Sequence, residues 1–339
     1  MKHSVVIGGA GFIGSWVVDE ILKDPNTQVT IVDNLISSER WNICLDSRVQ
    51  FIEGSAADSR TLEKISRKVD FVYQLACFHG NQSSIARPLD DLENGLKTTL
   101  VTLEWVKQNH PAARVLYSGA GCAVAEKTWG NPNSVSEIDF VQLAHDSPYS
   151  ISKITGEMYC LYYANQENID VVRVRFQNVY GPREILGAGI WRGTDNTLWR
   201  NVIPTFVYKA LNNHDIDIFS AEHASRDFTY VEDVAHAVVL AALNAKTGSL
   251  FNIASGQEVK IFDLLELIMK KTSSGSHINY FNRRSWDNSG RRIGEGSKIA
   301  RELGFKPKTS LDFGIDQTIK WTQSNLGMIN LAIDKHNKN

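Results

Sequence analysis

The stretch that decides the fold is SVVIGGAGFIG, residues 4–14. A short apolar run precedes three glycines, Gly8, Gly11 and Gly14, and an apolar stretch continues to Leu22. Glycines at this spacing let the backbone turn tightly, approach a pyrophosphate and pack a helix onto a sheet. The first turn of that helix offers N–H groups to phosphate oxygens. The order of strand, glycine turn and helix therefore predicts a dinucleotide site.

The second predicted strand, residues 29–32, ends at Asp33, which indicates the type of dinucleotide. A carboxylate at this place accepts hydrogen bonds from the adenosine ribose. It also repels the 2′-phosphate of NADP, and no arginine follows it directly, Arg40 being the nearest. The sequence therefore favours NAD over NADP as cofactor.

Strand and helix patterns alternate along the first half of the chain. Apolar, β-branched runs predict strands at residues 4–7, 29–32, 49–52, 71–75, 115–117 and 171–174. Amphipathic stretches predict helices at residues 13–22, 92–108 and 150–165. This alternation predicts an α/β fold, a doubly wound parallel sheet of the Rossmann type. Ligands of such sheets bind at the carboxyl ends of the strands.

The pattern changes after the sequence YGP at residues 180–182. Helices are predicted near residues 203–211, 231–243, 261–271 and 311–321, with short strands near Asp217 and Phe228. We expect a Rossmann domain over residues 1–178, to which part of 227–255 returns, and a second, smaller α+β substrate lobe over residues 179–339. The polar tail after Asn325 is expected to fray.

Composition and charge exclude several classes of protein. The 339 residues carry a formal net charge of −2, so no nucleic-acid partner is expected. Four irregularly spaced cysteines indicate neither a disulfide framework nor a metal site. The N-terminus lacks a signal-peptide pattern, and the longest uncharged apolar stretch, residues 237–243, is too short to span a bilayer. We expect a cytoplasmic protein with no membrane partner.

Tyr149 and Lys153 stand four positions apart, which places both side chains on one face of a helix. Oxidation of a sugar alcohol needs a base that takes the hydroxyl proton. A phenol titrates at about 10, and a nearby ammonium with a positive nicotinamide ring lowers its pKa. We interpret the pair as catalytic because it follows the fifth predicted strand directly after Ser147 and Pro148. The alternative is a chance spacing on a solvent-exposed helix.

These motifs resemble those of the extended short-chain dehydrogenase/reductase family, the nucleotide-sugar epimerases and dehydratases. The resemblance covers nearly the whole chain. It rests on the glycine motif, DNL at 33–35, QLA at 74–76, Asn94, the Tyr149–Lys153 pair, RFQNVYGP at 175–182, VIP at 202–204, RDFTYVEDV at 226–234 and LGFKP at 303–307.

The resemblance implies roles for single residues. The NAD site would comprise Gly8, Gly11, Phe12, Ile13, Gly14, Asp33, Asn34, Ser55, Ala56, Leu75, Ala76, Tyr149, Lys153 and Phe176. A nucleotide-diphosphate sugar would contact Asn178, Asn201, Arg226 and one of Arg291 and Arg292, because arginine suits phosphate geometry. Arg226 could instead pair with Asp227 or Glu232, and the pair Arg291 and Arg292 could form a solvated basic turn.

Further expectations follow from the same resemblance. The family usually has Asp-Ile where this chain has Ser55 and Ala56, near the adenine. Residues 186–200, with Trp191, Arg192 and Trp199, would either face the substrate or pack within the smaller lobe. The resemblance also implies a homodimer, built from the helices near residues 92–108 and 150–165.

The loop after the fifth strand departs from the family. Ala120 stands where a Ser or Thr would hydrogen-bond the reacting hydroxyl, so Ser118, Cys122 or a water would take this role. The Asp-Glu acid pair of the family's 4,6-dehydratases is also absent, since Gly121 and Cys122 offer no carboxylic acid. Glu126 lies further along and could fold back. The departure disfavours dehydration and decarboxylation.

We therefore predict an NAD-dependent nucleotide-sugar epimerase that acts at C4 through a transient 4-keto sugar. Tyr149 would remove the hydroxyl proton while hydride passes to NAD and then returns to the other face of the sugar. Lys153 would lower the pKa of Tyr149. The alternatives are a nucleotide-sugar dehydratase or dehydrogenase, and a non-catalytic NAD-sensing module, which Ala120 alone supports.

Overall fold

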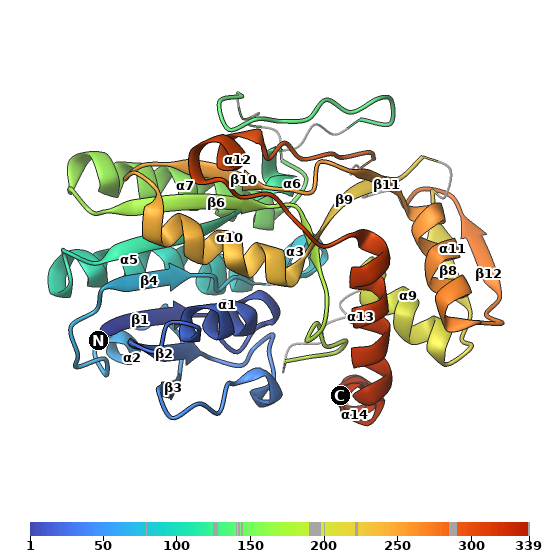
Figure 1. The fold of residues 1–339 in the computed structure, drawn as a ribbon, viewed down its shortest axis with the longest axis horizontal. Coiled ribbons are helices and arrows are strands. Elements are labelled where there is room, and N and C mark those ends of the chain that lie inside the picture. Colours follow the sequence, from blue (N-terminus) through green and yellow to red (C-terminus); the bar gives the residue numbers. More distant parts are fainter. Residues whose placement is uncertain are drawn as a thin grey trace.

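The computed structural model describes residues 1–78, 80–124, 128–139, 141, 143, 145–189, 198–199, 201–220, 223–284 and 290–337. Seven parallel strands form the central sheet in the order β10-β6-β5-β4-β1-β2-β3 (Figure 1). They are β1 (Lys2–Ile7), β2 (Thr27–Asp33), β3 (Val49–Glu53), β4 (Phe71–Gln74), β5 (Arg114–Ala120), β6 (Val171–Phe176) and β10 (Leu250–Ile253). The predicted doubly wound sheet is confirmed, with β10 as a strand supplied by the second half of the chain.

Helices cover both faces of this sheet. On one face lie α1 (Phe12–Leu22), α10 (Val231–Asn244) and α12 (Ser297–Leu303), and Figure 1 shows α1 and α10 side by side. On the other face lie α2 (Ser59–Leu62), α5 (Thr98–Asn109) and α7 (Pro148–Gln166). Each face buries its own apolar cluster, which explains why the strands are β-branched on both sides.

The helix predicted over residues 92–108 is interrupted. After α3 (Gly80–Ala86) and α4 (Pro88–Asp91), residues Leu92–Lys97 form a π-helical turn, η2, before α5 begins. The hydroxyl of Thr98 donates to the carbonyl oxygens of Glu93 (3.3 Å) and Asn94 (3.1 Å). A side chain that bonds these carbonyls supports the wider turn, and π turns of this kind are frequent at functional sites.

The smaller lobe is α+β, as predicted. Its strands are β7 (Asn178–Tyr180), β9 (Ser225–Tyr230) and β11 (Glu258–Lys260) in one sheet, and β8 (Ile216–Phe219) and β12 (Ile278–Phe281) in another. Its helices α9 (Val202–Leu211), α11 (Ile261–Thr272) and α13 (Leu311–Ser324) enclose a third apolar cluster. The boundary at residues 178 and 179 stays a prediction, because α12 and β10 pack with the large sheet.

The expectation that the C-terminal tail frays is wrong. Residues Leu326–Asn337 form helix α14, which lies at the end of α13 (Figure 1). Ile329, Ala332 and Ile333 are buried against the segment that holds Ile185 and Leu198. Their spacing of three and four residues gives one apolar face. Residues 326–333 contain only one polar side chain, Asn330, so the polar character of the tail begins only after this face.

The remaining described elements are short, a 3₁₀ turn η1 (Arg40–Asn42) and α6 (Gly121–Val124). Glu126, Trp191 and Arg192 lie outside the described residues. No helix within the described ranges has the length and apolar character needed to cross a lipid bilayer.

Candidate active site

One cavity of about 840 Å³ lies at the carboxyl ends of the central strands and continues into the smaller lobe. Its volume is in the range of pockets that hold small molecules. At one end it is lined by the glycine turn between β1 and α1, and at the other by residues of β8 and β9. The residues predicted for the cofactor and those predicted for the sugar nucleotide therefore share one cavity.

The glycine turn forms a cradle that a side chain would fill. Gly8 has a φ of +84°, and a Cβ there would lie 2.8 Å from the backbone nitrogen of Ala76. A Cβ on Gly14 would collide with the carbonyl oxygen of Gly8. Gly11 is the N-cap residue of α1, and no side chain caps the first turn. Gly11, Phe12 and Ile13 line the cavity, so the N-terminus of α1 lies where the N–H groups of a helix could bind a pyrophosphate.

Asp33 ends β2 on the wall of the same cavity. Its carboxylate accepts hydrogen bonds from the backbone N–H of Ala10 (3.0 Å), the N–H of Leu35 (2.9 Å) and the hydroxyl of Ser38 (2.8 Å). Burial raises the pKa of Asp33, and these hydrogen bonds act in the opposite direction. The carboxylate is thus fixed between the glycine turn and the loop after β2. It lies where the sequence motif predicts contact with the ribose of the dinucleotide.

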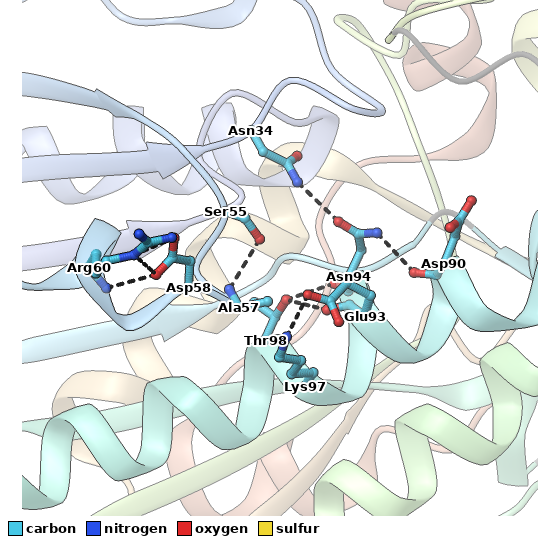
Figure 2. Close-up of polar contacts among 10 residues, drawn as sticks. All are labelled: Asn34, Ser55, Ala57, Asp58, Arg60, Asp90, Glu93, Asn94, Lys97 and Thr98. Carbon is cyan, nitrogen blue, oxygen red and sulfur yellow. Dashed lines mark hydrogen bonds and ion pairs between the residues drawn. The ribbon is translucent and has the colours of Figure 1, made fainter.

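Figure 2 shows the polar contacts beyond Asp33. The amide of Asn34 donates to the side-chain oxygen of Asn94 at 3.0 Å, and the amide of Asn94 donates to the carbonyl oxygen of Asp90 at 2.9 Å. Asn34, Asn94 and Ser55 all line the cavity. Asn94 lies within the π turn, so the interruption of the helix places this amide next to the loop after β2. The sequence motif contained Asn94 but assigned it no contact.

The other predicted cofactor residues lie on the same wall. Ala56, Leu75, Ala76 and Phe176 line the cavity at the carboxyl ends of β3, β4 and β6. Lys153 is the exception among the predicted set, because it is buried behind the wall with only 6% of its surface exposed.

Tyr149 and Lys153 lie in the first turns of α7, whose N-terminus is capped by the hydroxyl of Ser147. Tyr149 lines the cavity. The Nζ atom of Lys153 lies 5.9 Å from the centre of the Tyr149 ring and donates to the carbonyl oxygen (2.8 Å) and hydroxyl (3.3 Å) of Ser118. The structure therefore brings the predicted pair together and anchors the ammonium to β5.

Burial of the phenol raises the pKa of Tyr149 above its ordinary value, and the nearby thiols of Cys77 and Cys122 act in the same direction. From the sequence, a lowered pKa of Tyr149 was predicted. Burial raises this pKa because the charged phenolate loses its hydration. A positive charge beside the phenol acts in the opposite direction.

The end of β5 and the start of α6 distinguish the two side chains that could contact the reacting hydroxyl, Ser118 and Cys122. Ala120 and Cys122 line the cavity. Ser118 is absent from the described wall, since its hydroxyl donates to the carbonyl oxygen of Gln74 (3.1 Å). Asp146, three positions before Tyr149, also lines the cavity. Asp146 was not among the predicted site residues, although its place just before the helix of Tyr149 was a usable signal.

At the opposite end, Asn178 and Asn201 line the cavity as predicted for a sugar diphosphate. The amide of Asn178 donates to the carbonyl oxygen of Asp227 at 2.9 Å. The amide of Asn201 donates to the carboxylate of Glu184. Trp199 lines the cavity and also packs against the cluster under α14, so its position agrees with packing in the lobe and leaves the contact with substrate a prediction.

Arg226 lines the cavity, and its Nη1 donates to the carbonyl oxygens of Ser225 (2.7 Å) and Gly290 (2.6 Å). The alternative of a pair with Asp227 is disfavoured, because that buried carboxylate accepts hydrogen bonds from three residues elsewhere. They are Ser255, Gly256 and Gly294.

The structure separates Arg291 from Arg292. Arg292 lines the cavity with 8% of its surface exposed. Arg291 forms a two-pronged ion pair with Glu258, with Nε to Oε1 at 2.7 Å and Nη2 to Oε2 at 2.8 Å. Arg292 is therefore the member of the pair that is placed to meet a phosphate.

A family model described as the NAD dependent epimerase/dehydratase family matches residues 4–254. The chain belongs to this family. The predicted resemblance is thus confirmed, and so is NAD as the cofactor of the family. This chain is similar to two solved structures of the enzyme WbmF from Bordetella bronchiseptica, one in complex with NAD⁺ and the other in complex with NAD⁺ and UDP. Identity is 43% and the TM-score 0.88, with 99% of this chain covered and 97% or 96% of WbmF.

Two further relatives show the breadth of the family. The epimerase Mth375 of Methanothermobacter thermautotrophicus is 30% identical, with a TM-score of 0.86 and coverage of 97% of this chain and 94% of that one. A dTDP-glucose 4,6-dehydratase of Actinoplanes sp. is 27% identical over 95% of this chain and 98% of its own. The protein is therefore an enzyme of a family whose members include epimerases and dehydratases.

Proposed function

We propose that this enzyme is a nucleotide-sugar 4-epimerase whose substrate is a UDP-sugar. The observation that carries the proposal is the single cavity that joins the glycine turn, the phenol of Tyr149 and the guanidinium groups of Arg226 and Arg292. A sugar held between the arginines and the cofactor cradle would lie beside Tyr149. The complex of WbmF with NAD⁺ and UDP, at 43% identity, supports uridine diphosphate as the nucleotide part.

The proposed reaction uses one proton site. Ionised Tyr149 takes the proton of the 4-hydroxyl and later returns it, while Lys153, held by Ser118, stabilises the phenolate. NAD, when bound, supplies the hydride acceptor and gives the hydride back. Arg226 and Arg292 hold the diphosphate, which leaves the sugar ring free to present its other face to the cofactor.

Cys122 is the proposed partner of the reacting hydroxyl. It lines the cavity beside Ala120, where the family has Ser or Thr, whereas Ser118 is bonded to Gln74 and Lys153. A thiol is a weak hydrogen-bond donor and acceptor, so it orients the hydroxyl less firmly than a serine would.

A dehydratase is the second candidate, and Asp146 is the observation that favours it. Elimination of water needs an acid–base group beyond the tyrosine, and Asp146 lines the cavity near the start of α7. Residues 119–122 carry no carboxylic acid, which supports epimerisation. Incubation of the purified enzyme with UDP-sugars, followed by proton NMR, separates the two candidates. A 4-epimer at equilibrium with the substrate is the expected product, and a 4-keto-6-deoxy sugar would instead favour the dehydratase.

The homodimer is also a proposal. Helix α7 presents exposed apolar side chains at Ile151, Met158, Tyr159 and Tyr162, and Leu92 of η2 is exposed beside it. An apolar face of this kind indicates an interface, and we assign it to a second copy of the chain. Sedimentation of the enzyme at twice the monomer mass is expected, with Met158→Glu shifting it toward monomer.

A further inference from the structure

The segment that carries Arg291 and Arg292 turns its two arginines to opposite sides. It is extended and forms isolated bridges with Thr128 and with Ser225 of β9. Neighbouring side chains of extended backbone point to opposite faces. Arg292 consequently lines the cavity, while Arg291 points away from it and is not among the cavity-lining residues that the structure describes.

Arg291 joins three separate parts of the chain. Its guanidinium holds both oxygens of Glu258 on β11, and its Nη1 donates to the side-chain oxygen of Asn131 at 2.8 Å and the carbonyl oxygen of Gly130 at 3.2 Å. Glu258 also accepts from the hydroxyl of Ser225, next to Arg226. The ion pair with Arg291 lowers the pKa of Glu258, so the pair stays charged at neutral pH.

Backbone contacts place the same segment against Arg226. The guanidinium of Arg226 donates to the carbonyl oxygen of Gly290, and the N–H of Arg292 donates to the carbonyl oxygen of Ser225 at 3.3 Å. The N–H of Gly294 donates to the carboxylate of Asp227 at 3.1 Å. Two guanidinium groups are thereby held on one cavity wall.

Arg292 directly follows Arg291 on this extended segment, so contacts that fix Arg291 also fix the backbone from which Arg292 faces the cavity. An anchor at Arg291 would therefore hold Arg292 in place before substrate arrives. We propose that the Arg291–Glu258 ion pair is this anchor, a positioning pair that keeps Arg292 facing the diphosphate of the substrate. The proposal rests on the proposed function. Neither Arg291 nor Glu258 touches the substrate, and both act through Arg292.

The test is the affinity of the NAD-loaded enzyme for UDP, measured by calorimetry. Arg291→Met is expected to weaken UDP binding by roughly 3- to 10-fold, a coupling of ordinary size for residues in one network. Affinity for NAD and kcat are expected to stay within about twofold of the wild type, and KM for the UDP-sugar to rise. Glu258→Gln should give the same result and serves as a second variant should Arg291→Met fold poorly.

A matched control comes from Arg48, which pairs with Asp46 through Nε (3.0 Å) and Nη2 (2.7 Å) at the start of β3. Its side chain is 26% exposed, the same as that of Arg291, and it is not among the described cavity-lining residues. Arg48→Met should leave UDP affinity unchanged. If loss of an ion pair lowered UDP affinity through general instability, both Arg291→Met and Arg48→Met would bind UDP more weakly. A positioning role predicts weaker UDP binding for Arg291→Met only.

A double-mutant cycle with Arg292→Met tests the route of the effect. If Arg291 acts through Arg292, the substitution Arg291→Met has no further effect on UDP affinity in the Arg292→Met background. The positioning role is overturned if Arg291→Met weakens UDP binding equally in that background. It is also overturned if Arg291→Met and Glu258→Gln both bind UDP with wild-type affinity. Either result leaves the proposed function intact. A wild-type enzyme that binds no UDP overturns the proposed substrate class, and the positioning role with it.

Discussion

At the residue scale, the phenol of Tyr149 lies on the cavity wall with the ammonium of Lys153 5.9 Å from its ring centre. Tyr149→Phe removes the group that exchanges the proton and leaves the ring in place. Turnover should fall by roughly 10²- to 10⁴-fold, the usual contribution of a general base. Calorimetry should show unchanged affinity for NAD and UDP. A folded variant with near-normal turnover would exclude Tyr149 as the acid–base group.

Asp33 is expected to determine the choice of dinucleotide. Its buried carboxylate is held by Ala10, Leu35 and Ser38 on the cavity wall, where the glycine motif predicts the ribose. Asp33→Ala should weaken NAD binding and narrow the difference between NAD and NADP, because the repulsion of a 2′-phosphate is lost. Fluorescence titration with both dinucleotides measures this. A wild-type preference for NADP would contradict the assignment.

Cys122 and Ser118 differ in what they face, although the sequence offered both. Cys122→Ala should lower kcat, since the thiol lines the cavity beside Ala120. Cys122→Ser should retain or raise activity, because a hydroxyl is the stronger hydrogen-bond partner. Steady-state rates of the two variants decide the matter. Equal rates for wild type and Cys122→Ala would leave a water or a substrate group as the orienting partner.

At the scale of elements, the sequence predicted those strands and helices that show a regular hydrophobic periodicity. The six strands found from β-branched runs and the helix carrying Tyr149 lie where expected, because periodicity follows burial directly. Helix α14 was missed because polar residues dominate the end of the chain, 334–339, and the apolar face of Ile329, Ala332 and Ile333 is explained only by its contact with Ile185 and Leu198. The π turn was missed because its widened hydrogen bonding has no periodic signature.

Helix α14 gives a stability prediction with an internal control. Ile329 is 2% exposed, whereas Leu331, two positions on, is 59% exposed. Ile329→Ala should lower the free energy of unfolding by about 2–5 kcal/mol, and Leu331→Ala should change it by about 0.5 kcal/mol or less. Urea unfolding followed by circular dichroism measures both. Equal effects would mean that α14 does not pack against Ile185 and Leu198.

At the scale of the whole molecule, the candidate site combines segments that are distant in sequence. The cofactor end could be read from the chain, since one contiguous strand, turn and helix builds it. The sequence could not decide which of Arg291 and Arg292 lines the cavity at the substrate end. The side to which each side chain of this extended segment points depends on its contacts with Thr128, Ser225 and Glu258. Those contacts form only when the two lobes assemble.

The central claim is that hydride leaves and returns to the same carbon within one cavity. The most direct test is turnover of the UDP-sugar substrate in D₂O, with the product analysed by NMR and mass spectrometry. Epimerisation predicts a 4-epimer of unchanged mass with no deuterium on carbon, because the hydride never exchanges with solvent. Deuterium at C5 or C6, together with loss of water from the product, would contradict the account and point to Asp146 as a second acid–base group.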